Sequence, residues 1–285
     1  MDYILHILIS ACISGILVLG INLALGMTGL IHLGHVALAG VGAYTAGILL
    51  TTAHVPFVIA LVAGVAAGAV VGWIVGLPTR DVRGDAFALA TLAAAWVYLI
   101  AALSWETLTG GSLGVVGIPR PRFALRNDEF FLLAVGALAV TYAVIARVAH
   151  SPFGRVLGAI RDDETAARVF GKRTIAAKRA CLAIAGATAG LAGVLTASFI
   201  QFLHPSMFWL PSLIAVLTAL ILGGVGSLGG SLVGVAILTA IGEGVRFVPF
   251  PPEYLGALRL TITALILLLI LLLRPRGLFG KVDIR

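Results

Sequence analysis

The sequence predicts an all-α fold, a polytopic transmembrane helical bundle of about nine spans within a range of 8–10. Hydrophobic residues make up 60% of the 285 residues and charged residues only 11%, against roughly 25% in soluble domains. Several apolar runs approach ~20 residues, and in lipid a run of that length satisfies its backbone polar groups as a helix. Lys and Arg gather at the ends of these runs, so membrane orientation accounts for the net charge of +7, and nucleic-acid binding is excluded.

The spans follow one another along the whole chain in windows of ~19 residues. They are expected at residues 3–25, 36–52, 56–77, 86–104, 130–148, 181–202, 209–222, 231–248 and 255–273. The first run is interpreted as a retained span, because no Lys or Arg precedes it and a signal peptide begins with a positively charged region. Residues 1–285 are therefore predicted to form a single transmembrane domain, with residues 149–179 as a cytoplasmic loop within it.

Basic residues predict which side of the membrane each loop faces, because cytoplasmic loops are enriched in Lys and Arg. The stretch that includes the 149–179 loop holds eight of them: Arg147, Arg155, Arg161, Arg168, Lys172, Arg173, Lys178 and Arg179. The tail after Leu273 is also basic, so the C-terminus is expected in the cytoplasm, and counting spans backwards places the N-terminus outside. The loop from Trp105 to Glu129 is then outside, although it contains three arginines.

Glycines predict close helix contacts and two broken segments. The third span carries glycines four residues apart, a stripe that admits a neighbouring helix or a partner subunit: Gly64, Gly68, Gly72 and Gly76. Gly226, Gly230 and Gly234 repeat this spacing. The segments Leu23–Gly47 and Ala219–Gly244 each contain an apolar run, a Gly-rich interruption and a second run, which predicts an internal repeat of parallel type. Paired interruptions indicate a substrate pathway in transporters, with two ordinary turns as the alternative.

Polar residues inside apolar runs are the candidates for this pathway, because unpaired polar groups are costly in lipid. The candidates are Asn22, His35, Tyr44 and Thr45, with His32 beside them and Gly223 and Gly224 in the second interruption. An interhelical hydrogen bond is the alternative role for each polar residue. Glu243 and Arg246 are expected to pair with each other, and Asp85 is expected to cap the fourth span.

The 149–179 loop is predicted to contain a short helix from Asp163 to Phe170, capped by Asp162 and ended by Gly171 in the left-handed conformation. Thr174 is expected to cap the next helix. Ala166, Val169 and Phe170 fall on one side of the short helix. Because so short a helix is marginal in water, its apolar ridge is predicted to lie in a groove of another protein.

The same loop carries a family resemblance. Its run GAIRDDETAARVFG, from Gly158 to Gly171, resembles the cytoplasmic signature loop of ABC-importer permeases of the branched-chain amino acid (LivM-like) family. Further motifs occur in the expected order: LGHVALAGVGAYTAG at 33–47, VRGDAFALATLA at 82–93, LTGGSLGV at 108–115, HPSMF at 204–208, LGGVGSLGGSLVG at 222–234 and RPRGLFG at 274–280. The resemblance extends along most of the chain.

The resemblance implies a multi-pass protein of a bacterial-type cytoplasmic (inner) membrane with three kinds of partner. These are cytoplasmic P-loop ATPase subunits that receive the loop, a second, LivH-like permease subunit that completes the pore, and a periplasmic or surface solute-binding protein that delivers the solute. It also implies that the following residues couple the permease to the ATPase: Ile160, Arg161, Asp162, Asp163, Glu164, Ala167, Phe170 and Gly171.

The sequence contains no catalytic constellation, so the chain is not expected to be an enzyme. Cys12 and Cys181 have no spacing partners and are interpreted as small buried residues, which leaves no metal site. No GxxxxGK[ST] loop is present, so ATP is expected to be used by a partner and no cofactor by this chain. The chain is thus predicted to be an importer permease for branched-chain amino acids, with urea or aromatic acids as other solutes. The alternative is a self-sufficient secondary transporter or channel, a class that usually places charged groups inside its spans.

Overall fold

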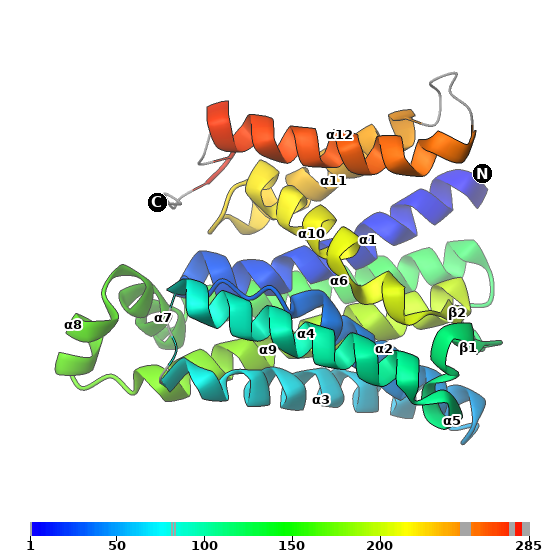
Figure 1. Cartoon of the computed structure of the whole chain (residues 1–285), viewed down its shortest axis with the longest axis horizontal. Helices are drawn as coiled ribbons and strands as arrows, with labels where there is room; N and C mark the ends of the chain where they lie inside the picture. The colour runs from blue at the N-terminus through cyan, green and yellow to red at the C-terminus, as the bar shows by residue number, and fades with distance from the viewer. Residues whose placement is uncertain (1, 81, 83, 246–251, 274–276, 281–285) are drawn as a thin grey trace.

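A computed structural model of the chain describes residues 2–80, 82, 84–245, 252–273 and 277–280. In this part the fold is all-α apart from one two-stranded pairing. The long helices run roughly parallel to one axis (Figure 1). They are α1 (Asp2–Asn22), continued by a π-helical segment η1 (Leu23–Met27), then α2 (His35–Thr51), α3 (Phe57–Val75), α4 (Gly84–Ser104), α6 (Asn127–His150), α9 (Thr174–Ile200), α10 (Leu210–Gly223), α11 (Leu228–Gly244) and α12 (Pro252–Leu273).

Each predicted span falls on one of these helices, which confirms the all-α, polytopic fold class. Over the described residues, six helical stretches are long and apolar enough to cross a membrane: Asp2–Met27, Phe57–Thr79, Gly84–Ser104, Asn127–His150, Thr174–Ile200 and Pro205–Gly223. The apolar helices at His35–Thr51, Leu228–Gly244 and Gly256–Ile270 are shorter. The predicted number of about nine spans therefore includes three helices that do not reach this length.

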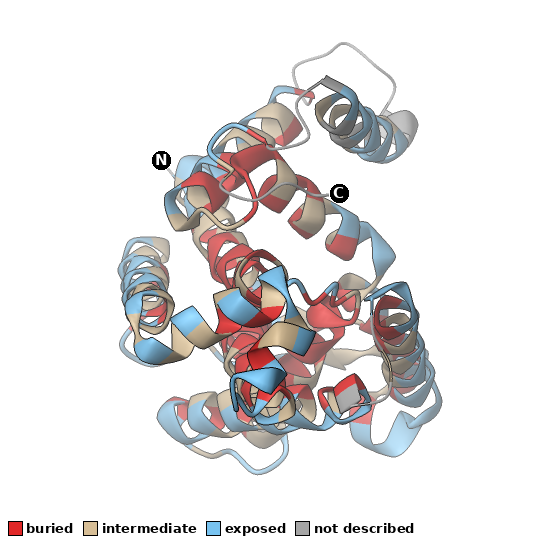
Figure 2. Cartoon of the chain, turned by 90° about the vertical axis from the view of Figure 1, so that its left-hand side faces the viewer, coloured by how far each residue is buried: buried red, intermediate tan, exposed pale blue. Residues whose placement is uncertain are grey.

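Helix α9 lies at the centre of the bundle. In its most apolar stretch 67% of the residues are buried, more than in any other candidate span of the described residues. It packs against α1, α2 and α3, and its buried face consists largely of Ala and Gly. Figure 2, viewed from the end that carries α7 and α8, shows buried residues in the middle of the bundle and exposed residues on the outer helices.

The glycine stripe of the third span packs within the chain. Gly68 and Gly72 of α3 lie so close to the backbone carbonyls of Gly186 and Leu182 in α9 that an added Cβ would overlap them. The suggestion that this stripe receives a partner subunit is therefore wrong, because α9 occupies that face. Two helices whose backbones meet at glycines gain close van der Waals contact, which drives association in lipid.

The glycines of the second half serve two different purposes. Gly230 and Gly234 of α11 face the carbonyls of Gly223 and Ala219 in α10, so these two follow the predicted pattern. Gly226 lies in the turn between the helices with a φ of 81°. That left-handed conformation suits glycine, and Gly226 is a turn residue rather than part of a packing stripe.

The 105–129 loop is fastened at the end of the molecule opposite α7 and α8 (Figure 1). Strand β1 (Val115–Val116) pairs antiparallel with β2 (Phe202–Leu203), which follows the C-terminal end of α9. Short helices α5 (Glu106–Thr109), η3 (Gly111–Leu113) and η4 (Pro205–Phe208) complete this end.

Arg120, one of the three arginines of this loop, is held by contacts within the chain. Its guanidinium donates hydrogen bonds to Leu125 O and Asn127 Oδ1, both at 3.0 Å. It also lies 5.6 Å and 5.5 Å from the ring centroids of Phe130 and Phe199. The charge is thus held by hydrogen bonds and cation–π contacts and anchors the loop.

Candidate coupling loop and broken helices

The loop between α6 and α9 folds into two short helices, α7 (Pro152–Asp162) and α8 (Glu164–Val169). Helix α7 begins where Ser151 Oγ accepts a hydrogen bond from Gly154 N at 3.2 Å. Sequence reasoning missed α7, although Ser-Pro at a helix start and apolar residues at helical spacing are a recognisable signal. Leu157 and Ile160 are buried in one cluster with Leu19, Leu23 and Cys181. Helix α7 is therefore packed onto the inner core rather than free in the loop.

Helix α8 is capped by Asp163 and not, as predicted, by Asp162. Asp163 Oδ1 accepts hydrogen bonds from Thr165 N at 2.8 Å and from Ala166 N at 2.9 Å. Asp163 has an extended backbone, as an N-cap requires, whereas Asp162 is the last residue of α7.

After α8, the prediction for Gly171 is confirmed and the prediction for Thr174 is corrected. Gly171 has a φ of 75°, the predicted left-handed stop. Thr174 is the first residue of α9 and follows Arg173 at the N-cap, where no side chain caps the helix. The prediction that Thr174 caps this helix is therefore wrong.

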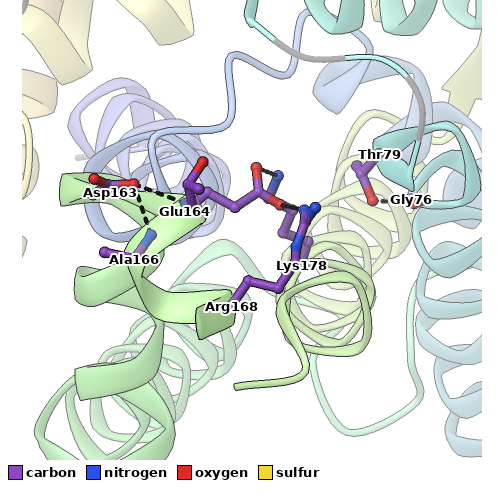
Figure 3. A network of polar contacts seen from close by, with 8 residues as sticks. Gly76, Thr79, Asp163, Glu164, Ala166, Arg168 and Lys178 are labelled. Carbon is purple, nitrogen blue, oxygen red and sulfur yellow. Dashed lines mark hydrogen bonds and ion pairs between the residues drawn. The ribbon is translucent and has the colours of Figure 1, made fainter. Parts of the chain in front are cut away.

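Glu164 binds two basic residues within the chain. Its carboxylate accepts from Lys178 Nζ at 2.6 Å and from Arg168 Nη2 at 3.0 Å (Figure 3). The side chains of Glu164 and Lys178 are 14% and 5% exposed. A pair this deeply buried is costly to break from one side, because the remaining charge stays uncompensated. Glu164 therefore fixes α8 to α9.

The tip of the loop is apolar and exposed. Val169 and Phe170 are 81% and 79% exposed, while Ala166 is half-buried and Ala167 is buried. Among the predicted coupling residues, Asp162, Asp163, Phe170 and Gly171 lie at the surface, and Ile160 and Ala167 belong to the chain's own core.

The irregular stretch between α1 and α2 is the first break. It begins at Asn22, a fully buried residue at the end of α1. Its side-chain amide donates to Ser231 Oγ at 2.8 Å and to Ser227 O at 3.1 Å. Its side-chain oxygen accepts from Gly226 N at 2.9 Å. Both ends of the amide therefore bind the second break, which joins two segments about two hundred residues apart in the chain. The pairing of these two breaks is not visible in the sequence.

The second break is the turn between α10 and α11. Residues 277–280 pack against it through backbone hydrogen bonds. Helix α10 ends at Gly223, and Gly224 follows with a φ of 108°. Leu278 N donates to Leu222 O and Phe279 N donates to Gly223 O, both at 3.0 Å. These bonds satisfy carbonyls that a helix end leaves without an intrahelical donor.

The other pathway candidates lie along α2. His35 Nε2 is 3.1 Å from Leu17 O, and its Nδ1 has no hydrogen-bond partner. The Tyr44 hydroxyl is buried and unpartnered, and its ring centroid is 6.5 Å from that of Tyr98, whose hydroxyl is also buried and unpartnered. Thr45 donates to Val41 O in its own helix at 2.8 Å. His35 thus faces α1, and Tyr44, nine positions later on the opposite side of α2, faces α4. Thr45 makes an ordinary intrahelical bond.

Two further residues, His32 and Tyr98, also carry buried polar atoms without hydrogen-bond partners. His32 is 2% exposed with neither ring nitrogen bonded, and its ring centroid is 5.9 Å from that of His35. Tyr98 of α4 was missed because its apolar run belongs to neither of the two broken segments from which the candidates were taken. A cavity of about 40 Å³ is lined by His32, Thr91 and Tyr98 together with apolar residues of α2, α3 and α4.

Three smaller predictions concern Glu243, Asp85 and a metal site. Glu243 Oε2 accepts from the Tyr3 hydroxyl at 2.6 Å, and its expected partner Arg246 lies outside the described residues. Asp85 lies in the first turn of α4, so its charge rather than a cap position favours the helix start. No group of three His, Cys, Asp or Glu residues suited to a metal ion occurs in the described part of the chain.

Comparison with known proteins gives one family. The model of the family described as branched-chain amino acid transport system / permease component matches residues 3–271. The high-affinity branched-chain amino acid transport system permease protein LivM of Escherichia coli K12 is 30% identical, over 92% of this chain and 67% of the relative. The corresponding LivH of the same strain is 24% identical, over 94% and 92%. The probable branched-chain amino acid transport permease protein LivM of Methanocaldococcus jannaschii is 26% identical, over 79% and 68%. No solved structure gives a significant match.

Proposed function

The chain belongs to the branched-chain amino acid transport permease family, and we propose that it forms part of the translocation pathway for branched-chain amino acids in an ATP-driven importer. The family consists of transporters and not of enzymes. A multi-pass location in the inner membrane follows from the family and from the six long apolar helices of the described residues.

The permease has nine spans in this proposal, with an outer N-terminus and a cytoplasmic C-terminus. The three shorter apolar helices, α2, α11 and α12, complete the six long ones. The arrangement in Figure 1 supports this count, because α7, α8 and the end of α12 lie at one end of the bundle and the β1–β2 pair at the other. Both breaks then face the cytoplasm, and their contact through Asn22 supports an internal repeat of parallel type.

The loop tip docks into a cytoplasmic P-loop ATPase subunit. The observation that carries this proposal is the exposure of Val169 and Phe170 on a short helix held rigidly by an ion pair. Two large apolar side chains at the tip of a charged loop would be unfavourable in water, and a groove on a partner removes them from it. Asp162 and Asp163, at the other end of α8, are also exposed and give the same loop negative charge.

The proposal is tested by replacing Phe170 with alanine and purifying the permease in mild detergent. We expect the ATPase to be lost from the purified complex while the permease stays folded, because Phe170 makes little contact within its own chain. Phe123→Ala is the matched control, since this phenylalanine is 60% exposed and belongs to the 105–129 loop at the other end. Equal ATPase recovery from both variants would contradict the docking role of Phe170.

The pathway passes α2 and the two breaks. His32, His35, Tyr44 and Tyr98 offer buried polar atoms without partners, which suits a route that receives a polar solute transiently. Asn22, Gly223 and Gly224 lie at the cytoplasmic end of this route, and Thr45 is its least supported member. The route needs little affinity of its own, because a separate solute-binding protein delivers the amino acid.

The proposal includes further partners. Both LivM and LivH permeases resemble the chain, which supports a pore built from two permease subunits, one of them LivH-like. A periplasmic or surface solute-binding protein contacts the outer end. ATP is used by the ATPase subunits, and this chain binds no cofactor.

A further inference from the structure

A hydrogen bond from Arg161 joins the coupling loop, the segment between α6 and α9, to the first break, beside the apolar packing of Leu157 and Ile160 against Leu23. Arg161, near the end of α7, donates from Nη1 to the carbonyl of Gly26 at 3.0 Å. Its Nε and Nη2 bind Asp162 Oδ1 at 3.0 Å and 2.9 Å. Gly26 belongs to the π-helical segment that ends the first broken helix, where carbonyls lack the donors of a following turn. Arg161 therefore holds the end of that helix to the loop.

The first break is in turn tied to the second by Asn22. Asn22 binds Ser227, the N-cap residue of α11, and Ser231 in the first turn of that helix. It also binds the turn itself at Gly226 N. Gly26 lies only four positions after Asn22, so the Arg161 contact and the Asn22 contact lie within one short segment.

The parts on either side of these contacts are held firmly. Helix α7 is packed through Leu157 and Ile160, and α8 is fixed to α9 by the Glu164–Lys178 pair. The π-helical segment contacts both α7 and α9. Such segments are rare in proteins overall but occur often at functional sites. A displacement of the loop therefore reaches the irregular segment by Arg161 without first being absorbed by a flexible connection.

We propose that Arg161 and Asn22 are positioning residues that carry movement of the coupling loop to both broken helices. This rests on the proposed function, since it assumes that the ATPase moves the loop. Arg161 sets the position of the first break, and Asn22 moves the start of α11 together with it. Neither residue needs to touch the solute. Their loss separates ATP hydrolysis from transport, whereas loss of a docking residue removes the ATPase.

The test measures solute uptake per ATP hydrolysed in proteoliposomes that contain the whole importer, with leucine as the probe. Arg161→Met keeps the length of the side chain and removes its donors, and Asn22→Leu keeps the volume and removes the amide. Uptake per ATP should fall about tenfold in each, within the ordinary range of coupling free energies. Arg161→Lys retains a charged donor and should restore part of the ratio. Arg155→Met is the control, because Arg155 is exposed on the same helix.

Each outcome decides the proposal. Assembly and hydrolysis that persist while uptake per ATP falls would support it, with Arg161→Lys between the Met variant and the unaltered chain. An unchanged ratio in Arg161→Met and Asn22→Leu would overturn it. Failed assembly, or uptake and hydrolysis that fall in proportion in every variant including Arg161→Lys, would show a purely structural role and would also overturn it. An unaltered chain that recruits no ATPase would instead refute the proposed function.

Discussion

Glu164 is a predicted coupling residue whose carboxylate also binds two basic side chains of its own chain. An acidic residue in a docking loop is expected to meet a partner, but this carboxylate is buried between Lys178 and Arg168. Reversing the charges of Asp163 and Glu164 together would remove a helix cap and a buried ion pair at once. Such a variant would report on the folding of the loop, and the exposed Phe170 is the better probe of the ATPase contact.

Glu164→Gln is expected to destabilise the permease by about 3–5 kcal/mol, because it leaves the Lys178 ammonium buried without its counter-ion. Thermal unfolding of the purified chain in detergent measures this. Asp162→Asn is the control, since the side chain of Asp162 is 70% exposed and should change stability little. If both variants unfolded at the same temperature, the buried pair would not hold the loop.

The unpartnered tyrosine hydroxyls separate a structural role from a transport role at single residues. A buried hydroxyl without a hydrogen bond destabilises a fold, so Tyr98→Phe should leave stability unchanged or raise it by about 1 kcal/mol. If the hydroxyl serves the solute pathway, uptake should nevertheless fall. The measurement pairs thermal unfolding with uptake, and Tyr142→Phe on α6, whose side chain is 37% exposed, is the control. Uptake equal to that of the control would remove Tyr98 from the pathway.

Sequence reasoning failed at the residue scale where two neighbours are chemically alike. Asp162 and Asp163 are both good caps, and only the backbone decides which one adopts the extended conformation. The orphan hydroxyl of Tyr98 likewise depends on what α2 and α3 place around it. The left-handed glycine at 171 was predictable because its signal is local.

At the scale of elements, helix positions were predictable and their partners were not. Apolar length places each long helix, since the bilayer sets that length. The short helix α7 was missed because it lies in a charged loop, although Phe153, Val156, Leu157 and Ile160 follow the spacing of an amphipathic helix. The contact between α3 and α9 could be expected as a close approach but not assigned, because a glycine stripe does not name its neighbour.

Gly68→Ala should destabilise the bundle by about 1–3 kcal/mol, because its Cβ would overlap the Gly186 carbonyl and force α3 from α9. Gly136→Ala on α6 is the matched control, since no atom lies within 4 Å of its added Cβ. The melting temperatures of the two variants in detergent give the comparison. A control that was as unstable as Gly68→Ala would mean that any alanine in place of a helical glycine has this effect.

At the scale of the whole molecule, the two ends of the bundle differ in structure and in proposed role. The end with α7, α8 and segment 277–280 gathers both breaks and the exposed loop tip, while the β1–β2 pair and Arg120 stiffen the other end. Charge asymmetry predicted the first end from the sequence. The long-range contacts that make it a unit, Asn22 with Gly226 and Arg161 with Gly26, join residues whose proximity no local pattern encodes.

The central claim is that this chain is a permease driven by a separate ATPase through its cytoplasmic loop. The most direct measurement is to purify the chain from its own membrane in mild detergent, identify the proteins that accompany it and assay ATP hydrolysis. The account predicts a P-loop ATPase and a second, LivH-like permease in the purified complex, with measurable hydrolysis. A stable single species without ATPase activity, still able to take up branched-chain amino acids in liposomes, would contradict it.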